Sequence, residues 1–265
     1  MKIGSTKDRA SAISTANAET IVVRGRDLCR DLIGSLSFTQ YFWLLVTGEA
    51  ASAAQARVLD ACLVAIAEHG LVPSVQAARM TYAAGPEAMQ GAVAAGILGC
   101  GSVILGSAED AGCFLSDVRA RADGGDLAAA ARAAIEDCRA AKRPFPGYGH
   151  PLHRTADPRA ARVLSVAAEA GLAGPHAAAA RAAERAIVEV TGKSLVLNVS
   201  GAIPAVLLDA GFPLAGMKGV PILARTASLV AHLVEEQARA IGFALSEAAE
   251  TGIAYDGAVP PGFTA

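Results

Sequence analysis

Strong helix formers fill most of this chain, and glycine or proline interrupts them at intervals of about 15–20 residues. Alanine, leucine, glutamate and arginine dominate residues 54–69, 126–141, 159–171 and 176–190. Valine and isoleucine gather only in a short run near Glu19–Val23, so little sheet is expected. The pattern predicts a mainly α fold.

Two helix starts can be predicted from local residues. Asp157-Pro158 is typical of an N-cap followed by proline at the first helical position. Pro221 opens a second helix, which we expect to run to about Gln237. The tail from Tyr255 carries too much proline and glycine for a helix.

Length and composition narrow the class of protein. The 265 residues suit one large domain or two smaller ones, and 53% hydrophobic against 18% charged residues is the reverse of a disordered chain. Lys+Arg number 23 against 25 Asp+Glu, so no basic excess exists for a nucleic-acid partner. Five scattered cysteines without a CxxC pair predict neither a disulfide framework nor a metal site. Free thiols and the lack of an apolar leader favour a cytoplasmic protein.

One apolar segment has two interpretations. Gly91–Ala108 contains 18 residues without a charge, near the lower limit for a membrane-spanning helix. It is rich in glycine, and neither an aromatic belt nor a basic flank frames it. We therefore expect a core helix that ends in a glycine-rich turn, and no membrane partner.

The segment most informative for function is Arg143–Arg159, RPFPGYGHPLHRTADPR. Its prolines and glycines predict a loop, which presents His150 from irregular backbone between Gly149 and Pro151. A histidine placed in this way can donate a hydrogen bond to a substrate oxygen or exchange protons near neutral pH. The alternative is a turn histidine in solvent, and the local residues do not decide between the two.

Arg159 is expected in the first turn of the helix that follows Asp157-Pro158. A cation at a helix N-terminus opposes the helix dipole by roughly 0.3–1 kcal/mol. An anionic ligand beside Arg159 and His150 would offset this cost. The alternative is an exposed arginine paired with Asp157.

Four segments, in order, resemble motifs of the citrate synthase family. PGYGHPLHRTADPR resembles its PGxGH…DPR segment. The run from Glu68-His69-Gly70 to Arg79 looks like its acid-histidine-acid…Ser…Arg segment, and LNVSG at Leu197–Gly201 looks like its NVDxxSG segment. ARTASLVAH, from Ala224 to His232, resembles its ARTxGxxAHxxE helix. The resemblance covers roughly residues 25–245.

The short chain and its RPFPGYGH loop look more like the citryl-CoA lyases and the C-terminal module of ATP-citrate lyase. The resemblance implies a mainly α protein with a large domain, residues 1–111 and 215–265, and a small domain, residues 112–214. It also implies a homodimer or higher homo-oligomer. A coenzyme A thioester and a di- or tricarboxylate would be the ligands, without a permanently bound cofactor or a metal.

The resemblance assigns roles to individual residues. His150 matches the histidine that bonds the oxaloacetate carbonyl or the citryl hydroxyl, and His69 matches an oxaloacetate-binding histidine. The residues that match the carboxylate-binding arginines are Arg159, Arg225 and Arg239. The residues expected to contact coenzyme A, chiefly through backbone, are Gly147, Tyr148 and Gly149.

The helix from Pro221 supports this assignment from its own spacing. Arg225, His232 and Arg239 follow at intervals of seven, so they share one helical stripe. Arg225 and Arg239 are separated by about 21 Å on a straight helix, too far for one small ligand. The family places its last arginine in the partner subunit's site, which agrees with this spacing. For His232 a satisfied core histidine is the simpler interpretation.

Two positions depart from the synthase motifs. Residues 103–109 align with PxHGGAN, so Leu105 stands where the first catalytic histidine is found. Ser200 stands where the family has a catalytic aspartate, and a hydroxyl is not a base without help from a neighbour. Ser200 as a nucleophile would need His150 as its base, and no oxyanion donor is evident. The leucine favours a lyase or another activity over a synthase, and the serine removes the base that the family's usual condensation requires.

The sequence therefore predicts an acyl-CoA enzyme that resembles citryl-CoA lyase, which converts citryl-CoA to oxaloacetate and acetyl-CoA, or citrate synthase. One alternative is a lyase or synthase for another 2-oxo acid and acyl-CoA pair. Another is a non-catalytic protein that binds coenzyme A or a tricarboxylate, because ligand-binding groups are retained without a base.

Overall fold

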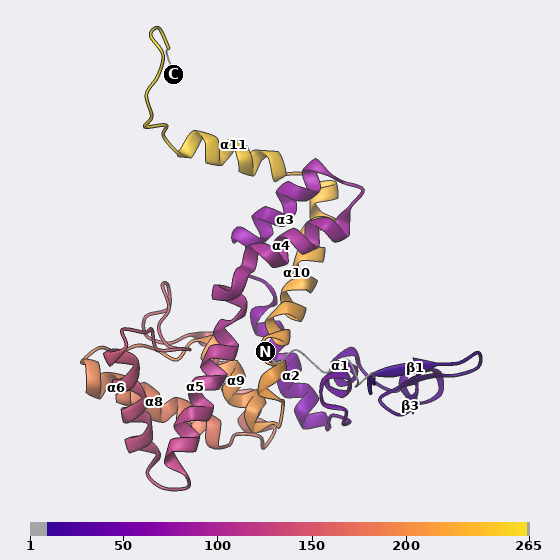
Figure 1. Ribbon diagram of the computed structural model, residues 1–265, viewed down its shortest axis with the longest axis vertical. Helices are drawn as coiled ribbons and strands as arrows, with labels where there is room; N and C mark the ends of the chain where they lie inside the picture. Colours follow the sequence, from indigo (N-terminus) through magenta and orange to yellow (C-terminus); the bar gives the residue numbers. More distant parts are fainter. Residues whose placement is uncertain (1–9, 264–265) are drawn as a thin grey trace. The chain divides into compact units, whose positions relative to one another are not determined.

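The computed structural model describes residues 10–263, which are mainly α-helical, as predicted (Figure 1). The helices are α1 (Phe38–Thr47), α2 (Ala53–Ala67), α3 (Pro73–Ala84), α4 (Met89–Leu105), α5 (Ser107–Ala122), α6 (Leu127–Ala140), α7 (Pro158–Glu169), α8 (Pro175–Thr191), α9 (Val199–Asp209), α10 (Gly219–Ala238) and α11 (Gly242–Gly252). Both predicted helix starts are confirmed, because Asp157 caps α7 and Pro221 lies in the first turn of α10. Residues 255–263 form no helix.

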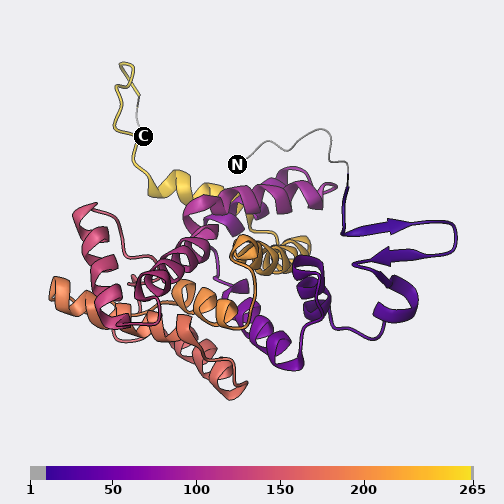
Figure 2. The same ribbon diagram turned by 60° about the horizontal axis from the view of Figure 1, so that its bottom comes forward.

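Three short strands form one antiparallel sheet in the order β1 (Ser14–Ala16), β2 (Ile21–Val23) and β3 (Arg26–Asp27). Figure 2 shows β1 and β2 as two indigo arrows joined by a turn. In their register Ser14 pairs with Val23 and Ala16 with Ile21. The β2 strand lies within the only stretch where the sequence gathers valine and isoleucine.

The described chain divides into two compact units. The first unit contains residues up to Ile66 together with Gly106–Pro221, and the second contains Ala67–Leu105 together with the residues from Ile222 onward. The predicted small domain, residues 112–214, lies within the first unit, and its exact boundaries stay a prediction.

In the first unit α5, α6, α8 and α9 pack against one another, and α7 packs on α9 (Figure 1). Alanine dominates these contacts, and the side chains of Ala131, Ala179 and Ala183 are fully buried. Gly112 of α5 lies against α9 and the turn after it, where an added Cβ would lie 3.2 Å from Pro204 Cβ of α9 and 2.8 Å from Leu214 Cδ1 of the turn. The small residues therefore let the helices approach closely, which holds the loop before α7 and the start of α9 in fixed places.

The second unit has its own apolar core, formed by α3, α4 and α10. Its fully or nearly fully buried members are Val75, Ala78, Tyr82, Ala92, Leu229 and Leu233. Gly96 of α4 lies against α10, because an added Cβ would come within 2.7 Å of Leu229 Cδ1. This core fixes α10, which carries several predicted site residues, against α3.

The apolar segment Gly91–Ala108 does not form one uninterrupted helix. The backbone of Gly101 has φ 59° and ψ 179°, a conformation that glycine adopts readily, and α5 begins at Ser107. By length and composition alone Met89–Ala122 could cross a membrane, and a third of its most apolar window is buried. Ala92 packs in the core of the second unit. The assignment of this segment to a soluble core stays a prediction.

Candidate functional site

The loop before α7 is held by the residues that precede α9. Gly149 N donates to Val196 O at 2.8 Å, and Asn198 N donates to Gly147 O at 2.9 Å. The side-chain amide of Asn198, the N-cap of α9, donates to Gly149 O at 2.8 Å. The backbone on both sides of Tyr148 is therefore fixed, immediately before His150.

Close packing requires glycine at the start of this loop. Gly147 has φ +85°, and an added Cβ would lie 2.6 Å from Gly201 Cα and 3.2 Å from Ala111 Cβ. The Tyr148 side chain points into the protein, where its hydroxyl donates to Ala180 O at 2.7 Å and burial raises its pKa. Of the three predicted coenzyme A contacts, Tyr148 thus offers only backbone to a ligand.

The hydrogen bonds of His150 define its tautomer. Its Nδ1 atom accepts from the backbone N–H groups of Leu152 at 3.1 Å and His153 at 2.9 Å. A nitrogen that accepts carries no hydrogen, so the neutral ring carries its hydrogen on Nε2. Burial, His153 and Arg159 together lower the pKa of His150. His150 is therefore a neutral hydrogen-bond donor at neutral pH.

Arg159 is held by Asp157, whose side chain is fully buried. Asp157 Oδ1 accepts from Arg159 Nε at 3.0 Å, and Oδ2 accepts from Arg159 Nη2 at 2.9 Å. Oδ2 also accepts from Val199 N at 3.0 Å, in the first turn of α9. Burial raises the pKa of Asp157, but these hydrogen bonds outweigh it and the net shift is downward. The ionised carboxylate therefore fixes the guanidinium and connects α7 to α9.

His150 and Arg159 converge on one place. Arg159 Nη2 lies 3.2 Å from His150 Nε2. Both atoms carry hydrogen, so neither can accept from the other, and an oxygen acceptor is the group that both can bind. With the Arg159 side chain 26% exposed, a ligand from solvent can reach this corner. The sequence alternative, in which Arg159 pairs with Asp157, is correct about this pairing. The same pairing also directs the guanidinium toward His150.

Ser200 is the second residue of α9, and its neighbour is another serine. Ser107 Oγ, at the first position of α5, donates to Ser200 Oγ at 3.1 Å. Two hydroxyls make a polar and neutral pair, without a group that is ionised at neutral pH. Leu105 is buried at the end of α4 and supplies no polar atom. The chemistry expected of a carboxylate is therefore not available from Ser200 in this arrangement.

The other predicted residues lie in the second unit. His69 follows α2, in a turn in which Gly70 has φ +66°. Arg225 is nearly buried on α10. Arg239 follows the last residue of α10, and its side chain is 81% exposed, 3.8 Å from Glu235. Its role in a partner's site stays a prediction.

The structure thus brings some predicted residues together and adds others. His150, Arg159 and the glycine loop meet in the first unit, next to the start of α9 that carries Ser200. Sequence reasoning gave Asp157 as a helix cap and as a partner for Arg159, but missed its hydrogen bond from the Val199 N–H of α9. It also missed Ser107, although this residue lies within the segment aligned with PxHGGAN.

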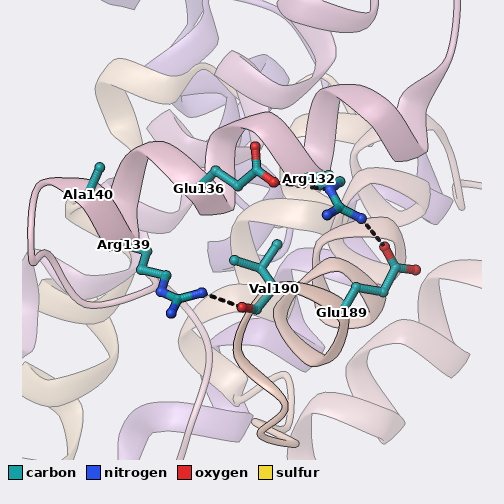
Figure 3. Close-up of a pocket in the computed structure, with 6 residues that line it drawn as sticks. All are labelled: Arg132, Glu136, Arg139, Ala140, Glu189 and Val190. Atoms are coloured by element: carbon teal, nitrogen blue, oxygen red, sulfur yellow. Dashed lines mark hydrogen bonds and ion pairs between the residues drawn. The ribbon is translucent and has the colours of Figure 1, made fainter.

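A polar hollow between α6 and α8 is a separate feature (Figure 3). Arg132 pairs with Glu136 at 3.0 Å and with Glu189 at 3.7 Å. Arg139 donates to the carbonyl of Val190. These groups satisfy one another on the surface, and no predicted site residue lines the hollow, so we do not assign it to the candidate site.

The structure is a mainly α protein in which a loop histidine, His150, and a helix-start arginine, Arg159, lie side by side. The chain belongs to the citrate synthase family, since the family model for the citrate synthase C-terminal domain matches residues 5–242. No curated protein matches the chain.

Solved structures agree with the family. The chain is similar to citryl-CoA lyase from Hydrogenobacter thermophilus, with 32% identity over 96% of this chain and 97% of that one, and a TM-score of 0.85. ATP citrate lyase from Methanosaeta concilii, in complex with (3S)-citryl-CoA, is 20% identical, with a TM-score of 0.74 over 99% of this chain and 43% of that one. Citrate synthase from Thermotoga maritima MSB8 is 20% identical, with a TM-score of 0.64 over 87% of this chain and 59% of that one. The last two show the fold alone.

Proposed function

We propose that this protein is an acyl-CoA carbon–carbon lyase whose substrate is citryl-CoA or a close analogue. The observation that carries the proposal is the convergence of His150 Nε2 and Arg159 Nη2, 3.2 Å apart, two donors that suit one anionic or carbonyl oxygen. The likeness to citryl-CoA lyase over nearly the full length of both chains supports the choice of substrate.

Each predicted site residue would have its own role in binding or in catalysis. His150 donates through Nε2 to the oxygen that is a hydroxyl in citryl-CoA and a carbonyl in oxaloacetate. Arg159 binds the neighbouring carboxylate, since a guanidinium matches a carboxylate in two-point geometry. His69 and Arg225 would bind the remainder of the di- or tricarboxylate, and Arg239 would act in a partner subunit. The backbone of Gly147–Gly149 would contact coenzyme A.

The Ser107–Ser200 pair bears on proton transfer in both directions of the reaction. Condensation begins when a base removes a proton from the carbon next to the thioester, and a hydroxyl pair supplies no such base at neutral pH. Cleavage is the reverse: the substrate hydroxyl gives up its proton, the carbon–carbon bond breaks, and the enolate carbon of acetyl-CoA takes a proton, with solvent accepting the first proton and supplying the second. The choice of a lyase over a synthase therefore rests on the likeness to citryl-CoA lyase over nearly the full length of both chains.

Two alternatives follow from the same serine. With a neutral Ser200 in place of the family's aspartate, the first alternative is that the substrate is another pair of 2-oxo acid and acyl-CoA. If no group replaces the base, the protein would instead bind coenzyme A or a tricarboxylate without turnover. Both alternatives keep the His150–Arg159 corner as a binding site.

We also propose a cytoplasmic homodimer without a nucleic-acid or membrane partner. The second unit exposes several large apolar side chains, which a partner subunit would cover: Leu98, Val103, Phe243, Ile253 and Tyr255. The described cysteines are free thiols, in keeping with a reducing compartment.

The proposed function is tested by incubating the purified protein with citryl-CoA and measuring oxaloacetate and free or acetylated coenzyme A by mass spectrometry. Calorimetry with citryl-CoA, coenzyme A and citrate runs in parallel. Cleavage that is lost in His150→Ala supports the lyase. Binding without turnover identifies the non-catalytic alternative, and absence of both contradicts the proposal.

A further inference from the structure

A chain of hydrogen bonds in the second unit runs through His232, which the proposed function does not use. The His232 side chain is 14% exposed, and both of its ring nitrogens have partners. Arg79 Nη1 lies 3.3 Å from Nδ1, and Glu68 Oε2 lies 3.1 Å from Nε2. His232 therefore joins a residue of α3 to a residue just before His69.

The chemistry of the two partners fixes the tautomer of His232. A guanidinium only donates, so Nδ1 of His232 accepts from Arg79. The ring hydrogen of the neutral imidazole then lies on Nε2 and is donated to the Glu68 carboxylate. In this tautomer the ring accepts from Arg79 and donates to Glu68, so both contacts are hydrogen bonds.

Arg79 is anchored and cannot follow a displaced histidine. Its Nε donates to Glu236 Oε2 at 2.6 Å, and both side chains are 2% exposed. Its Nη1 also pairs with Glu235 at 2.9 Å. Glu236 Oε1 accepts from Ile241 N at 2.9 Å and Gly242 N at 2.7 Å, where α11 begins. The Arg79 end of this chain of hydrogen bonds is thus buried in the core of the second unit.

The other end of this chain of hydrogen bonds is the turn that contains His69. The Glu68 carboxylate accepts from Gly70 N through one oxygen, so it closes the turn across His69. Its other oxygen accepts from Ser228 Oγ and from His232. Burial raises the pKa of Glu68, but these hydrogen bonds outweigh it and lower the pKa to about 2, so the group is ionised at neutral pH.

The two donors to Glu68 share a helix face with Arg225. Arg225, Ser228 and His232 are three and four residues apart on α10, so their side chains lie on one side of the helix. Glu68 is bound to this face by two of them. The position of the His69 turn relative to the helix that carries Arg225 is therefore set by Ser228 and His232.

We infer that His232 is a positioning residue: as a neutral Nε2–H imidazole it holds Glu68, and through Glu68 it holds His69 in register with Arg225. The inference rests on the proposed function in so far as His69 and Arg225 bind the carboxylate substrate. The competing explanation is that His232 only ties α3 to α10. The buried Arg79–Glu236 pair and the Val75–Leu233 cluster already do so.

The test compares His232→Ala and His232→Gln, with His176→Ala as matched control. Glutamine offers an oxygen acceptor and an N–H donor about as far apart as the two ring nitrogens. His176 also has both nitrogens bonded, to Asp209 at 2.8 Å and Arg119 at 3.1 Å, but it lies in the first unit. Long-range ¹H–¹⁵N NMR reads the tautomer of each of the five histidines in the ligand-free protein. Calorimetry then measures citrate binding, and thermal melting measures stability.

We expect His232 to carry hydrogen on Nε2 alone. His232→Ala should shift the His69 ring signals and weaken citrate binding by at least about tenfold, the value of one hydrogen bond to a charged group. His232→Gln should restore both. His176→Ala should lower the melting temperature as much and change neither the His69 signals nor the affinity.

Three results would overturn the inference. In the first, His232→Ala lowers the melting temperature but leaves the His69 signals and citrate affinity unchanged, which is a structural role only. In the second, His232→Gln restores neither the His69 ring signals nor the citrate affinity that His232→Ala loses. In the third, His232 carries its hydrogen on Nδ1. If wild type neither cleaves citryl-CoA nor binds citryl-CoA, coenzyme A or citrate, the proposed function fails, while the tautomer and the His69 signals still decide whether His232 positions this turn.

Discussion

Arg159 Nη2 lies 3.2 Å from His150 Nε2, and both atoms are hydrogen-bond donors. The His150 tautomer is fixed by two backbone N–H groups, and the Arg159 guanidinium is fixed by the buried Asp157. Neither side chain can turn away without losing those contacts. The pair is thus prepared for an oxygen acceptor before a ligand arrives, which lowers the cost of binding.

Removal of either arginine that we propose to bind carboxylates should weaken binding of citrate or oxaloacetate. For Arg159→Ala and Arg225→Ala we expect losses of about 2–5 kcal/mol each, as when one partner of a desolvated charge pair is removed. Titration calorimetry measures the effect, with Arg162→Ala as control, since Arg162 pairs with Glu169 on the exposed side of α7. Unchanged affinity in both variants would eliminate the carboxylate site.

Asp157 should contribute to stability through the backbone it satisfies. Asp157→Ala leaves the buried Val199 N–H without its acceptor, so we expect a loss of about 1–3 kcal/mol in the free energy of unfolding, measured in urea. The folded state lowers the pKa of this carboxyl. Its contribution is therefore complete above the unfolded-state pKa of about 3.9 and is lost as pH falls through the folded-state pKa.

The matched variant is Asp157→Asn, which keeps an oxygen acceptor but does not titrate. Its unfolding free energy should fall less steeply than that of wild type below about pH 4. Identical slopes for the two proteins would show that Asp157 does not carry this pH dependence.

The pH profile should report the neutral state of His150. The pKa of His150 is lowered from its ordinary value of about 6.5, so the neutral ring persists to lower pH than in an ordinary histidine. Protonation adds a hydrogen to Nδ1, which then faces the backbone N–H groups of Leu152 and His153. Binding of citrate, and turnover where present, should therefore change only below about pH 6.5. A profile in which activity requires protonation near pH 7 would contradict the assignment of hydrogen to Nε2.

A dimer is expected from the apolar surface of the second unit. Val103 is 91% exposed and Phe243 72%, and water contact with such side chains is unfavourable. Light scattering should give a stable dimer at micromolar concentration, with an interface of at least the standard size. A stable monomer would count against the dimer and against Arg239 as a residue of a partner's site.

The sequence predicted the helical class, the start of α7 and the loop that carries His150, because each depends on local backbone preferences of proline, glycine and capping residues. The proximity of His150 and Arg159 agrees with the hypothesis of a shared anionic ligand, which stays a prediction. The tautomer of His150 could not be predicted, since it depends on the N–H groups of Leu152 and His153 in one particular turn.

Long-range contacts account for most of what was missed. Glu68 and His232 are 164 residues apart, and Ser107 and Ser200 are 93 apart. No local pattern marks such pairs, because they form only when the helices pack. For His232 the satisfied-histidine interpretation was correct as to its bonds, but the sequence did not indicate that one of those bonds leads to the turn of His69.

Ser200 is the residue on which proton transfer in the proposed reaction depends. Ser200→Asp places a carboxylate where Ser107 now donates to a hydroxyl, and general bases contribute about 10²–10⁴-fold. The variant should therefore raise condensation or cleavage, provided that the longer side chain is accommodated. Ser107→Gly, combined with Ser200→Asp, provides the space and serves as the control for crowding. A fall in citryl-CoA cleavage in both variants would show that Ser200 is adapted to a different proton-transfer route.

The most direct test of the account is the rate of the two reactions in the same wild-type preparation, measured as citryl-CoA cleavage and as condensation of acetyl-CoA with oxaloacetate. We predict cleavage that depends on His150, poor condensation, and loss of all acyl-CoA activity in His150→Ala. Efficient condensation by wild type, or cleavage that survives in His150→Ala, would contradict the account.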